Sequence, residues 1–468
     1  MASVINNLNN NQLKLNQQKI APAFKGANDY LFRSLTGASK PLDSFLKMQE
    51  DLSVTRCVQD TATNWAPKAL FSRGKVDFGD MTFLEILEDF FFYFAPGLMG
   101  ENVMRKGIAS KFLKKEADKG LDEHLSKSVK EIVKDENLVK SGATKKLVPL
   151  KGAIILGCAC IPAAEYALSF AKNLFTLKVF KKADFNNVAN LQKNQVESKE
   201  HQDFVEKSAK KHLKNAAIIS GAGLGASVAL ASAGQKSKLI RKGIEVLLEP
   251  GETIADKLTK AGHNSKKADR FKEFLKTYLK FDFNNTKGKM TLSKGQLAII
   301  TTSGLFGYSA AAKDRGPLDY KEVWSRVPLV VFYTVFGSSI FDGAFKHILH
   351  KNNKFSDLIK ENKIGSLVVP SREELPDLAA DVAKNKKLKG VETTAEKELK
   401  RLVKEKSIIS GVPYLFSLVT MGFVLSGINR FWTQKRFDKS QEENKANKAQ
   451  SFITSIKNTP KIFNAFTK

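Results

Sequence analysis

The feature that most constrains this chain is its longest run without a charged side chain, which extends from Ser407 to Asn429. A bilayer core about 30 Å thick is spanned by roughly 20 helical residues, so this run is long enough to cross it. Basic and aromatic side chains gather at membrane interfaces, and Arg430 and Trp432 follow the run directly. We therefore predict a transmembrane helix here, with Arg430, Trp432 and, before another apolar run, Trp324 as interface anchors.

Five further stretches of the sequence are apolar. They cover residues 90–100, 152–171, 215–235, 295–312 and 327–341. Three of them approach the length of a membrane span, whereas the first and the last are closer to a buried core helix or a re-entrant segment. We predict an all-α helical membrane protein with four to six embedded helices and large basic helical loops. The alternative is a large soluble helical protein with buried helices.

The order of these stretches divides the chain into five parts. We predict a disordered lead-in at 1–41, where Asn and Gln are frequent, and a polar C-terminal tail at 437–468. Between them we predict a first helical repeat at 42–190, an intervening region at 191–289 and a second helical repeat at 290–436. The start of the chain lacks the apolar core of a cleavable signal peptide, so we expect a cytoplasmic N-terminus.

The division depends on a weak internal duplication, which appears in the hydropathy pattern and in the short segments that flank the apolar stretches more than in sequence identity. RGKVDF at 73–78 resembles RGPLDY at 315–320, and EILEDFFFYF from Glu85 resembles EVWSRVPLVV from Glu322. IILGCAC, which precedes Ile161, has a similar counterpart in IISGVPY. Both copies would point the same way, so we predict two parallel repeats. Transporters with such repeats carry their sites between the two halves.

Residues 215–235 admit two interpretations. Gly221, Gly223 and Ala226 match G-x-G-x-x-A, the loop of a dinucleotide-binding fold, which would make the chain a soluble enzyme. That loop needs a preceding strand and a later strand with an acidic end, and the sequence predicts neither. We instead predict a membrane helix with a face of small residues that lets a neighbouring helix approach closely. This face consists of Gly221, Gly225, Ala222 and Ala226.

The net charge of +28 favours polyanionic partners. The sequence contains no zinc-finger spacing or RNA-recognition motif, so we expect the lipid bilayer, its anionic lipid and other membrane proteins as partners, and not nucleic acid. Residues 265–283 combine lysines with an apolar face at helical spacing, which is typical of a helix on a membrane surface or docked on the protein's own core. The residues of that face are Phe271, Phe274, Leu275, Tyr278 and Leu279.

Few residues have a spacing that indicates chemistry. Glu165 is the one acid inside a long apolar run, which indicates either a proton or cation relay or a pair with a lysine. Glu85, Glu88 and Asp89 share a helical face, and we predict that this face is solvated. We predict no catalytic residue, metal or cofactor, because the sequence has no nucleophile–base motif and no phosphate-binding loop.

Two functions remain for a multi-pass integral membrane protein. The first is a non-catalytic scaffold or interaction protein, which the abundant loops and the scarcity of polar residues in the apolar segments favour. The second is a transporter- or channel-like helical bundle with Glu165 near its pathway. Basic residues flank both ends of the apolar segments, so the positive-inside rule assigns no orientation.

Overall fold

The computed structural model describes residues 37–50, 54–94, 127–192, 196–233, 238–263, 265–286, 289–362 and 365–458. These residues are almost entirely helical. The strands among them form two short antiparallel hairpins, β1 (Asn284–Thr286) with β2 (Lys289–Thr291) and β3 (Lys360–Glu361) with β4 (Leu367–Val368). The predicted all-α fold is confirmed.

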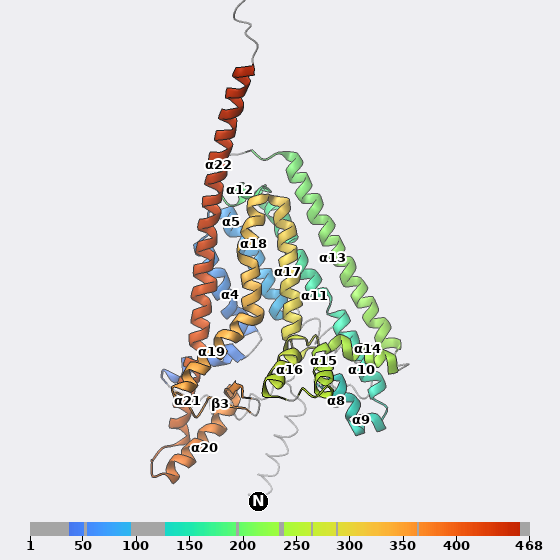
Figure 1. Cartoon of the computed structure of the whole chain (residues 1–468), viewed down its shortest axis with the longest axis vertical. Coiled ribbons are helices and arrows are strands. Elements are labelled where there is room, and N and C mark those ends of the chain that lie inside the picture. Colours follow the sequence, from blue (N-terminus) through green and yellow to red (C-terminus); the bar gives the residue numbers. More distant parts are fainter. Residues whose placement is uncertain are drawn as a thin grey trace, which may run out of the picture.

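Long helices stand side by side and form the body of the molecule (Figure 1). They are α4 (Val54–Leu70), α5 (Lys75–Asp89), α10 (Thr144–Gly157), α11 (Cys160–Phe180), α13 (Lys199–Ala233), α17 (Lys294–Arg315), α18 (Pro317–Phe332), α19 (Ser338–Lys351), α21 (Ala395–Ser417) and α22 (Leu425–Asn458). The shorter helices are α3 (Ser39–Glu50), α8 (Val129–Lys134), α9 (Glu136–Lys140), α12 (Phe185–Val188), α14 (Lys238–Leu248), α15 (Pro250–Lys260), α16 (Lys266–Tyr278) and α20 (Leu375–Leu388).

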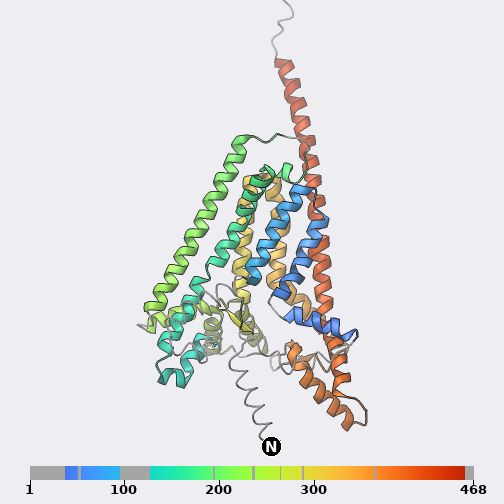
Figure 2. The same cartoon turned by 180° about the vertical axis from the view of Figure 1, so that it is seen from behind.

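The direction of the chain repeats within this bundle. α4 runs toward the end drawn uppermost in Figure 1, α5 runs back, and α11 returns to the upper end. α17, α18 and the continuous pair α21–α22 follow the same order, as the view from behind also shows (Figure 2). α13 packs along α11 and α10 and runs from the upper end to the lower end.

The second helix of each group begins and ends in the same way. α18 starts at Pro317, directly after Gly316, whose φ of 130° is rarely adopted by residues with a side chain. α5 starts directly after Gly74. Each helix then continues into a π-helical turn, at Phe90–Phe94 after α5 and at Tyr333–Gly337 after α18. Such turns insert one residue and rotate the side chains that follow.

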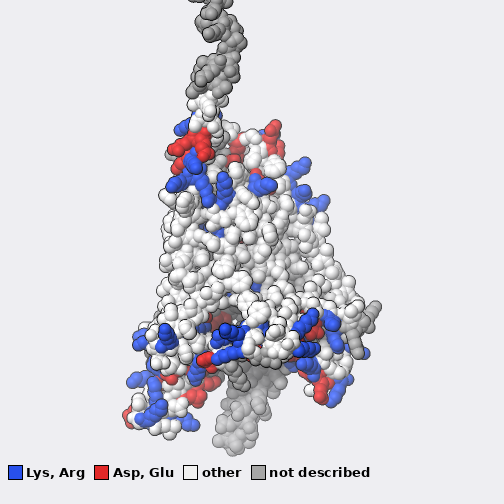
Figure 3. All heavy atoms as spheres, viewed as in Figure 1, with Lys and Arg blue, Asp and Glu red and all other residues white. Residues whose placement is uncertain are grey.

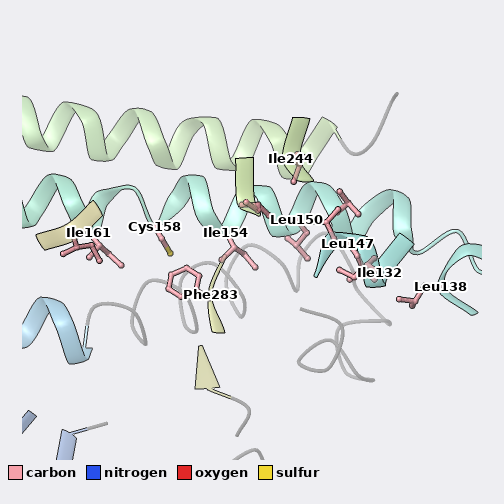
Figure 4. Close-up of a cluster of buried hydrophobic side chains, with 13 residues drawn as sticks. Ile132, Leu138, Leu147, Leu150, Ile154, Cys158, Ile161, Ile244 and Phe283 are labelled. Atoms are coloured by element: carbon pink, nitrogen blue, oxygen red, sulfur yellow. The ribbon is translucent and has the colours of Figure 1, made fainter. Parts of the chain in front are cut away.

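Two clusters of buried hydrophobic side chains lie at the lower end. The first joins α8, α9, α10 and α14 and includes Ile154, Ile244 and Phe283 (Figure 4). The second joins α3, α20 and α21 and includes Leu46 and Leu402. Each cluster attaches short helices at the lower end to a long helix of the bundle.

Charged side chains gather at both ends of the molecule, and the surface between these ends is mostly uncharged (Figure 3). Several large apolar side chains of the long helices are more than half exposed; they include Ile218, Phe306, Phe332 and Leu415. Four helical stretches among the described residues are long and apolar enough to cross a membrane by length and composition. They are Thr144–Phe180, Lys199–Ala233, Pro317–Lys351 and Ala395–Ser451.

The predicted apolar segments 152–171, 327–341 and 407–429, and 215–235 as far as residue 233, lie within these four stretches. The segment 295–312, which we expected to approach the length of a span, lies in α17 and is not among them, whereas 327–341, which we expected to be shorter, is. The segment 152–171 is divided at Cys158 and Ala159 into α10 and α11. The segment 407–429 is helical throughout, because a π-helical stretch at Leu418–Val424 joins α21 to α22. Of the segment 90–100, only residues 90–94 lie within the described ranges.

The two predicted terminal regions are only partly described. The lead-in at 1–41 lies outside the described residues up to residue 36, and α3 already begins at Ser39. The polar C-terminal tail at 437–468 is helical as far as Asn458, because α22 continues through it.

The interpretation of 215–235 as a dinucleotide-binding loop is wrong. Gly221 and Gly223 lie inside α13, a single helix of 35 residues. A phosphate-binding loop requires a turn between a strand and a helix, and residues 196–233 contain neither a strand nor a turn at this point.

Candidate functional site within the helical bundle

Eight charged side chains meet near the upper end of the bundle, and we call them the ion-pair cluster. They are Arg73, Asp77, Asp80, Lys172, Arg315, Asp319, Glu322 and Arg430. Their side chains are between 2% and 14% exposed. Four cations face four carboxylates, so the formal charge of the cluster is balanced. Such balance matters because an unpaired ion in a buried site costs several kcal/mol.

The first half of the cluster is built around Arg315. Its Nη1 donates to both carboxylate oxygens of Asp80, at 3.1 Å each, and to Oδ1 of Asn173 at 3.2 Å. Its Nε lies 3.3 Å from Oδ2 of Asp319, one helical turn further along the chain. Arg315 is the largest of the fully buried side chains in the described part of the chain. It therefore ties α17 and α18 to α5 and α11.

The second half is built around Glu322 on α18. Arg73 Nη1 lies 3.4 Å from Glu322 Oε2, and Arg430 Nη1 lies 3.0 Å from Oε1. Arg430 also contacts Asp77 at 3.3 Å, and Arg73 contacts the same aspartate at 3.4 Å. This half ties α18 to α5 and α22.

The two halves follow one pattern. Each consists of an arginine, a glycine, an aspartate four residues after the arginine and a second acid seven residues after it. Each arginine contacts the aspartate of its own segment. Each arginine also contacts the second acid of the other segment, because Arg73 contacts Glu322 and Arg315 contacts Asp80. The exchange is reciprocal between α5 and α18. Glu322 in α18 therefore corresponds to Asp80 in α5, whereas the sequence comparison aligned it with Glu85.

The third helix of each group adds a cation and a hydroxyl. Lys172 of α11 lies 3.4 Å from Asp80, and Thr176 donates a hydrogen bond of 2.5 Å to the same carboxylate. On the other side, α22 supplies Arg430 to Glu322, and the buried Thr433 lies beside it. Asp80 and Glu322 thus each have a cation and a threonine of the third helix beside them.

Three more acidic side chains lie deeper in the bundle, and we call them the carboxyl cluster: Glu85 and Glu88 on α5 and Glu165 on α11. Glu85 forms an ion pair with Lys68 of α4. Tyr308 of α17 donates a hydrogen bond of 2.5 Å to Glu88. Glu165 is 1% exposed, and its Oε2 has no hydrogen-bond partner.

The fold brings Glu165 close to α17. A Cβ atom built on Gly304 would lie 2.9 Å from Oε1 of Glu165, so the glycine leaves the space that this carboxyl occupies. Tyr308, which donates to Glu88, lies four residues after Gly304 on the same helix, so α17 lies against both acids. The predicted intramembrane acid therefore lies in the interior of the bundle, among other acids.

The predicted solvated face of α5 is wrong. Glu85 and Asp89 are 3% and 8% exposed. Glu85 pairs with Lys68, and Thr61 of α4 donates a hydrogen bond to Asp89. The face is buried because α4, α11 and the neighbouring α17 surround α5, which the local sequence does not reveal.

The predicted small face of α13 points away from the neighbouring helices of the described chain. Gly221, Gly225, Ala222 and Ala226 are all exposed, and both glycines have open space at the Cβ position. The contact with α10 and α11 is made by other small residues of the same helix. A Cβ on Gly223 would lie 2.9 Å from the carbonyl oxygen of Leu156, and Ser227 donates a hydrogen bond of 2.6 Å to the carbonyl of Ala153.

The predicted interface anchors divide into two kinds. Trp324 and Trp432 are 45% and 47% exposed, as anchors require. Arg430 is instead buried in the ion-pair cluster, so its assignment as an anchor is corrected.

The predicted surface helix is α16 with the residue that follows it. Phe271 and Phe274 are 53% and 45% exposed, whereas Leu275 is buried. Phe274 and Tyr278 stack on Phe336, with ring centroids 6.5 and 4.9 Å away. α16 thus contacts the bundle through Phe336 and leaves two rings exposed. The carbonyl of Leu279 accepts a hydrogen bond from the backbone N–H of Gly251, which joins the end of α16 to α15.

Sequence reasoning missed the ion-pair cluster, although it used the two Arg-Gly segments as markers of duplication. The signal was present in the acids at the fourth and seventh positions after each arginine, which share a helical face. Within the described ranges, no group of three or more His, Cys, Asp or Glu side chains has the geometry to hold a metal ion. Comparison with protein-family models, with curated proteins and with solved structures found no match.

Proposed function

We propose that this chain is a multi-pass integral membrane protein that acts as a transporter- or channel-like bundle of two parallel repeats. The carboxyl cluster carries this proposal, because it places three acids among apolar helices. Ionisable side chains at membrane depth are costly and mark ion pathways or proton relays. A scaffold has no comparable need for Glu165, whose Oε2 has no hydrogen-bond partner.

The surface of the bundle supports its insertion into a membrane. Four helical stretches have the length and composition of membrane spans, and charged side chains collect at the two ends. Exposed rings and aliphatic side chains such as Phe306, Phe332 and Leu415 belong to the long helices between those ends. A soluble monomer rarely exposes so much contiguous apolar surface.

The ion-pair cluster supports two parallel repeats. α5 and α18 begin after a glycine, end in a π-helical turn and point in the same direction. The reciprocal contacts of Arg73 with Glu322 and of Arg315 with Asp80 relate the two groups of helices to each other. In transporters built from parallel repeats, the axis lies along the membrane normal and the site lies between the halves.

The partners proposed for this protein are lipids and other membrane proteins. Basic residues at both ends of the bundle suit anionic headgroups, each contributing about 1 kcal/mol near the membrane surface. α16 supplies exposed rings next to lysines, an arrangement that suits the membrane interface. The proposed role is non-catalytic.

A scaffold is the second candidate, and one observation favours it. The lower end carries two sets of folded short helices, held by their own hydrophobic clusters, that extend past the bundle. Such regions offer surfaces to protein partners outside the membrane. This candidate requires membrane insertion but gives no role to Glu165.

Carbonate extraction tests membrane insertion, which both candidates require. We expect the full-length chain to stay in the membrane pellet after alkaline carbonate washing; release into the wash would contradict both candidates.

Ion flux separates the two candidates. Purified protein is reconstituted into vesicles that contain a pH-sensitive dye, and an imposed pH gradient is followed. We expect faster equilibration with the native chain, a return to the protein-free rate with Glu165→Gln, and no change with Glu392→Gln, which alters an exposed acid outside the bundle. Equal rates for native protein and Glu165→Gln would favour the scaffold.

A further inference from the structure

We infer that Phe185, together with the short helix α12 that carries it, is a plug that closes the upper end of the seam between the two groups of helices. The seam is the surface along which α4, α5 and α11 meet α17, α18 and the α21–α22 pair. The inference rests on the proposed function, for which it names the upper gate of the pathway. It depends on the contacts of the ring with two arginines, on the burial of α12 and on the difference between the two groups at this point.

The ring of Phe185 lies against one arginine from each group. The Cζ atom of Arg73 lies 5.3 Å from the ring centroid, and the Cζ atom of Arg315 lies 5.8 Å from it. Both distances are within the range of a cation–π contact. Arg73 and Arg315 are also the two arginines that contact the acids of the opposite group. A single side chain of the first group therefore touches both halves of the ion-pair cluster.

α12 is only four residues long, but it is packed like an element of the core. Phe185 is 5% exposed and Val188 is 1% exposed. The helix contacts α5 and α18, one helix from each group, and lies at the upper end of the bundle (Figure 1). Asn190, two residues after α12, donates a hydrogen bond of 2.9 Å to the carbonyl oxygen of Arg73. These contacts seat α12 across the seam.

The internal hydrogen bonds of this segment do not involve the seam. The side chain of Asp184 accepts from the backbone N–H of Asn186 at 2.8 Å and caps α12. Glu197, two residues before α13, accepts from the backbone N–H of Ala183 at 2.7 Å and from Nδ2 of Asn187 at 2.9 Å. α12 can therefore leave the seam as one folded unit that stays attached to the start of α13.

The second group has a similar third helix but continues it differently. SFAKNLFTLKVFKK at 169–182 is similar to SGINRFWTQKRFDK at 426–439, with identical serine, threonine, lysine and phenylalanine residues at matching places. Directly after this stretch the two copies diverge. α11 ends at Phe180 and Lys181 adopts a left-handed φ of 58°, whereas α22 continues as a helix to Asn458. The plug therefore belongs to one group but contacts both.

The interior directly below the plug is polar. Asn173 of α11 is 2% exposed, and its Oδ1 accepts from Arg315 at 3.2 Å. Ser169 and Glu165 follow at successive helical turns toward the lower end, and each is 1% exposed. Exclusion of water strengthens the ion pairs of the cluster, because charges attract each other more strongly in less polar surroundings. Removing the ring should therefore admit water to Asn173 and then to Ser169.

The access of a thiol reagent to position 169 tests the plug. Ser169→Cys is introduced into the full chain, whose three native cysteines are replaced by alanine. The chain is placed in lipid nanodiscs, treated with a small, water-soluble methanethiosulfonate reagent and followed by mass spectrometry. We expect slow labelling with Phe185 present and labelling about tenfold faster in Phe185→Ala, because both cation–π contacts that favour the closed position are lost. Phe185→Leu keeps part of the volume and should give an intermediate rate, even if Phe185→Ala does not fold.

A charge variant separates the plug from the charge balance of the ion-pair cluster. Phe185→Ala and Phe185→Leu change no charge, whereas Lys172→Met removes the cation that lies 3.4 Å from Asp80 and leaves the ring in place. We expect Lys172→Met to label at nearly the native rate. Faster labelling in Lys172→Met, with the native rate in both variants of Phe185, would show that charge balance closes the seam and would overturn the plug.

Phe437→Ala is the matched control for general loosening. Phe437 is a phenylalanine of α22 that is 7% exposed, and we expect the native labelling rate when its ring is removed. Equal acceleration in Phe437→Ala and Phe185→Ala would overturn the plug. Labelling requires no transport, so it is independent of the pH-gradient assay. Native labelling rates in Phe185→Ala and Phe185→Leu contradict the plug alone, whereas a failure of Glu165→Gln to slow equilibration contradicts the proposed function alone.

Discussion

Arg315 and Asp80 are 235 positions apart in the chain, yet one guanidinium nitrogen donates to both oxygens of the carboxylate at 3.1 Å. The contact joins the last residue of α17 to the helix α5. The contact between Arg73 and Glu322 joins the turn between α4 and α5 to the helix α18. The helix pair α4–α5 therefore supplies an arginine to Glu322, and the pair α17–α18 supplies one to Asp80. Neither helix pair provides all the ion-pair partners of its own buried acid.

Removing one member of this pair should destabilise the protein strongly. Arg315→Met leaves Asp80 and Asp319 without their guanidinium, and we expect a loss of about 3–5 kcal/mol in the free energy of unfolding. Unfolding of the purified chain by heat or denaturant measures it. The double variant with Asp80→Asn should lose less than the sum of the two single variants, because the partners are coupled. Lys397→Met, at an exposed position, is the control; strictly additive losses would contradict the coupling.

Two helical glycines should respond differently to the same substitution. In Gly307→Ala the new methyl group overlaps with the backbone carbonyl of Tyr166, so we expect a loss of roughly 1–3 kcal/mol. Gly225→Ala faces open space within α13, and we expect a change between zero and a gain of about 1 kcal/mol. Thermal unfolding of both variants checks this. A loss in Gly225→Ala as large as in Gly307→Ala would show that the outer face of α13 is in close contact with another chain.

Stability should depend on the protonation of Glu249, at the junction of α14 and α15. Burial raises the pKa of this carboxyl to about 7, the neighbouring Lys151 opposing the shift. The folded state thus binds a proton that the unfolded state has released above its ordinary pKa of about 4.5. The free energy of unfolding should therefore fall as pH rises from about 4.5 to about 7, by up to about 3 kcal/mol.

The variant Glu249→Gln isolates this dependence. It should remove that part of the pH slope and make the protein more stable than the native chain at pH 8, but not at pH 4. Unfolding at a series of pH values measures both. A native slope that persists in Glu249→Gln would assign it to other groups.

The exposed edge of α16 should contact lipid. We expect the fluorescence of a tryptophan in Phe271→Trp to be quenched by brominated lipid, beyond the quenching of the native tryptophans. Val391→Trp, between α20 and α21, is a matched control because both positions are 53% exposed. Equal quenching at the two positions would contradict the contact of α16 with the membrane.

The sequence predicts the helical segments well, because each signal is local. The run from Ser407 to Asn429 and the apolar stretch of α13 are visible as uncharged windows, and both are helical. The exclusion of a dinucleotide loop follows from the missing strand, which is also a local property. These predictions require no knowledge of which elements become neighbours.

The faces of the helices could not be predicted in the same way. α13 carries small residues around most of its circumference, so composition does not show that Gly223 faces Leu156 while Gly221 faces outward. Glu85 is followed by further acids and looks like part of a solvated surface until Lys68 is known to pair with it. The sequence indicated Glu165 because that acid interrupts an apolar run, but not the acids of α5 beside it.

α13 determines how the two groups of helices can be oriented. The first group starts at the lower end and leaves the chain at the upper end, with α11. If the second group followed directly, it would have to start at the upper end and would be inverted, and the reciprocal arginine contacts could not form. One additional return pass brings the chain back to its starting side, which makes α13 a connector whose essential property is its length and direction.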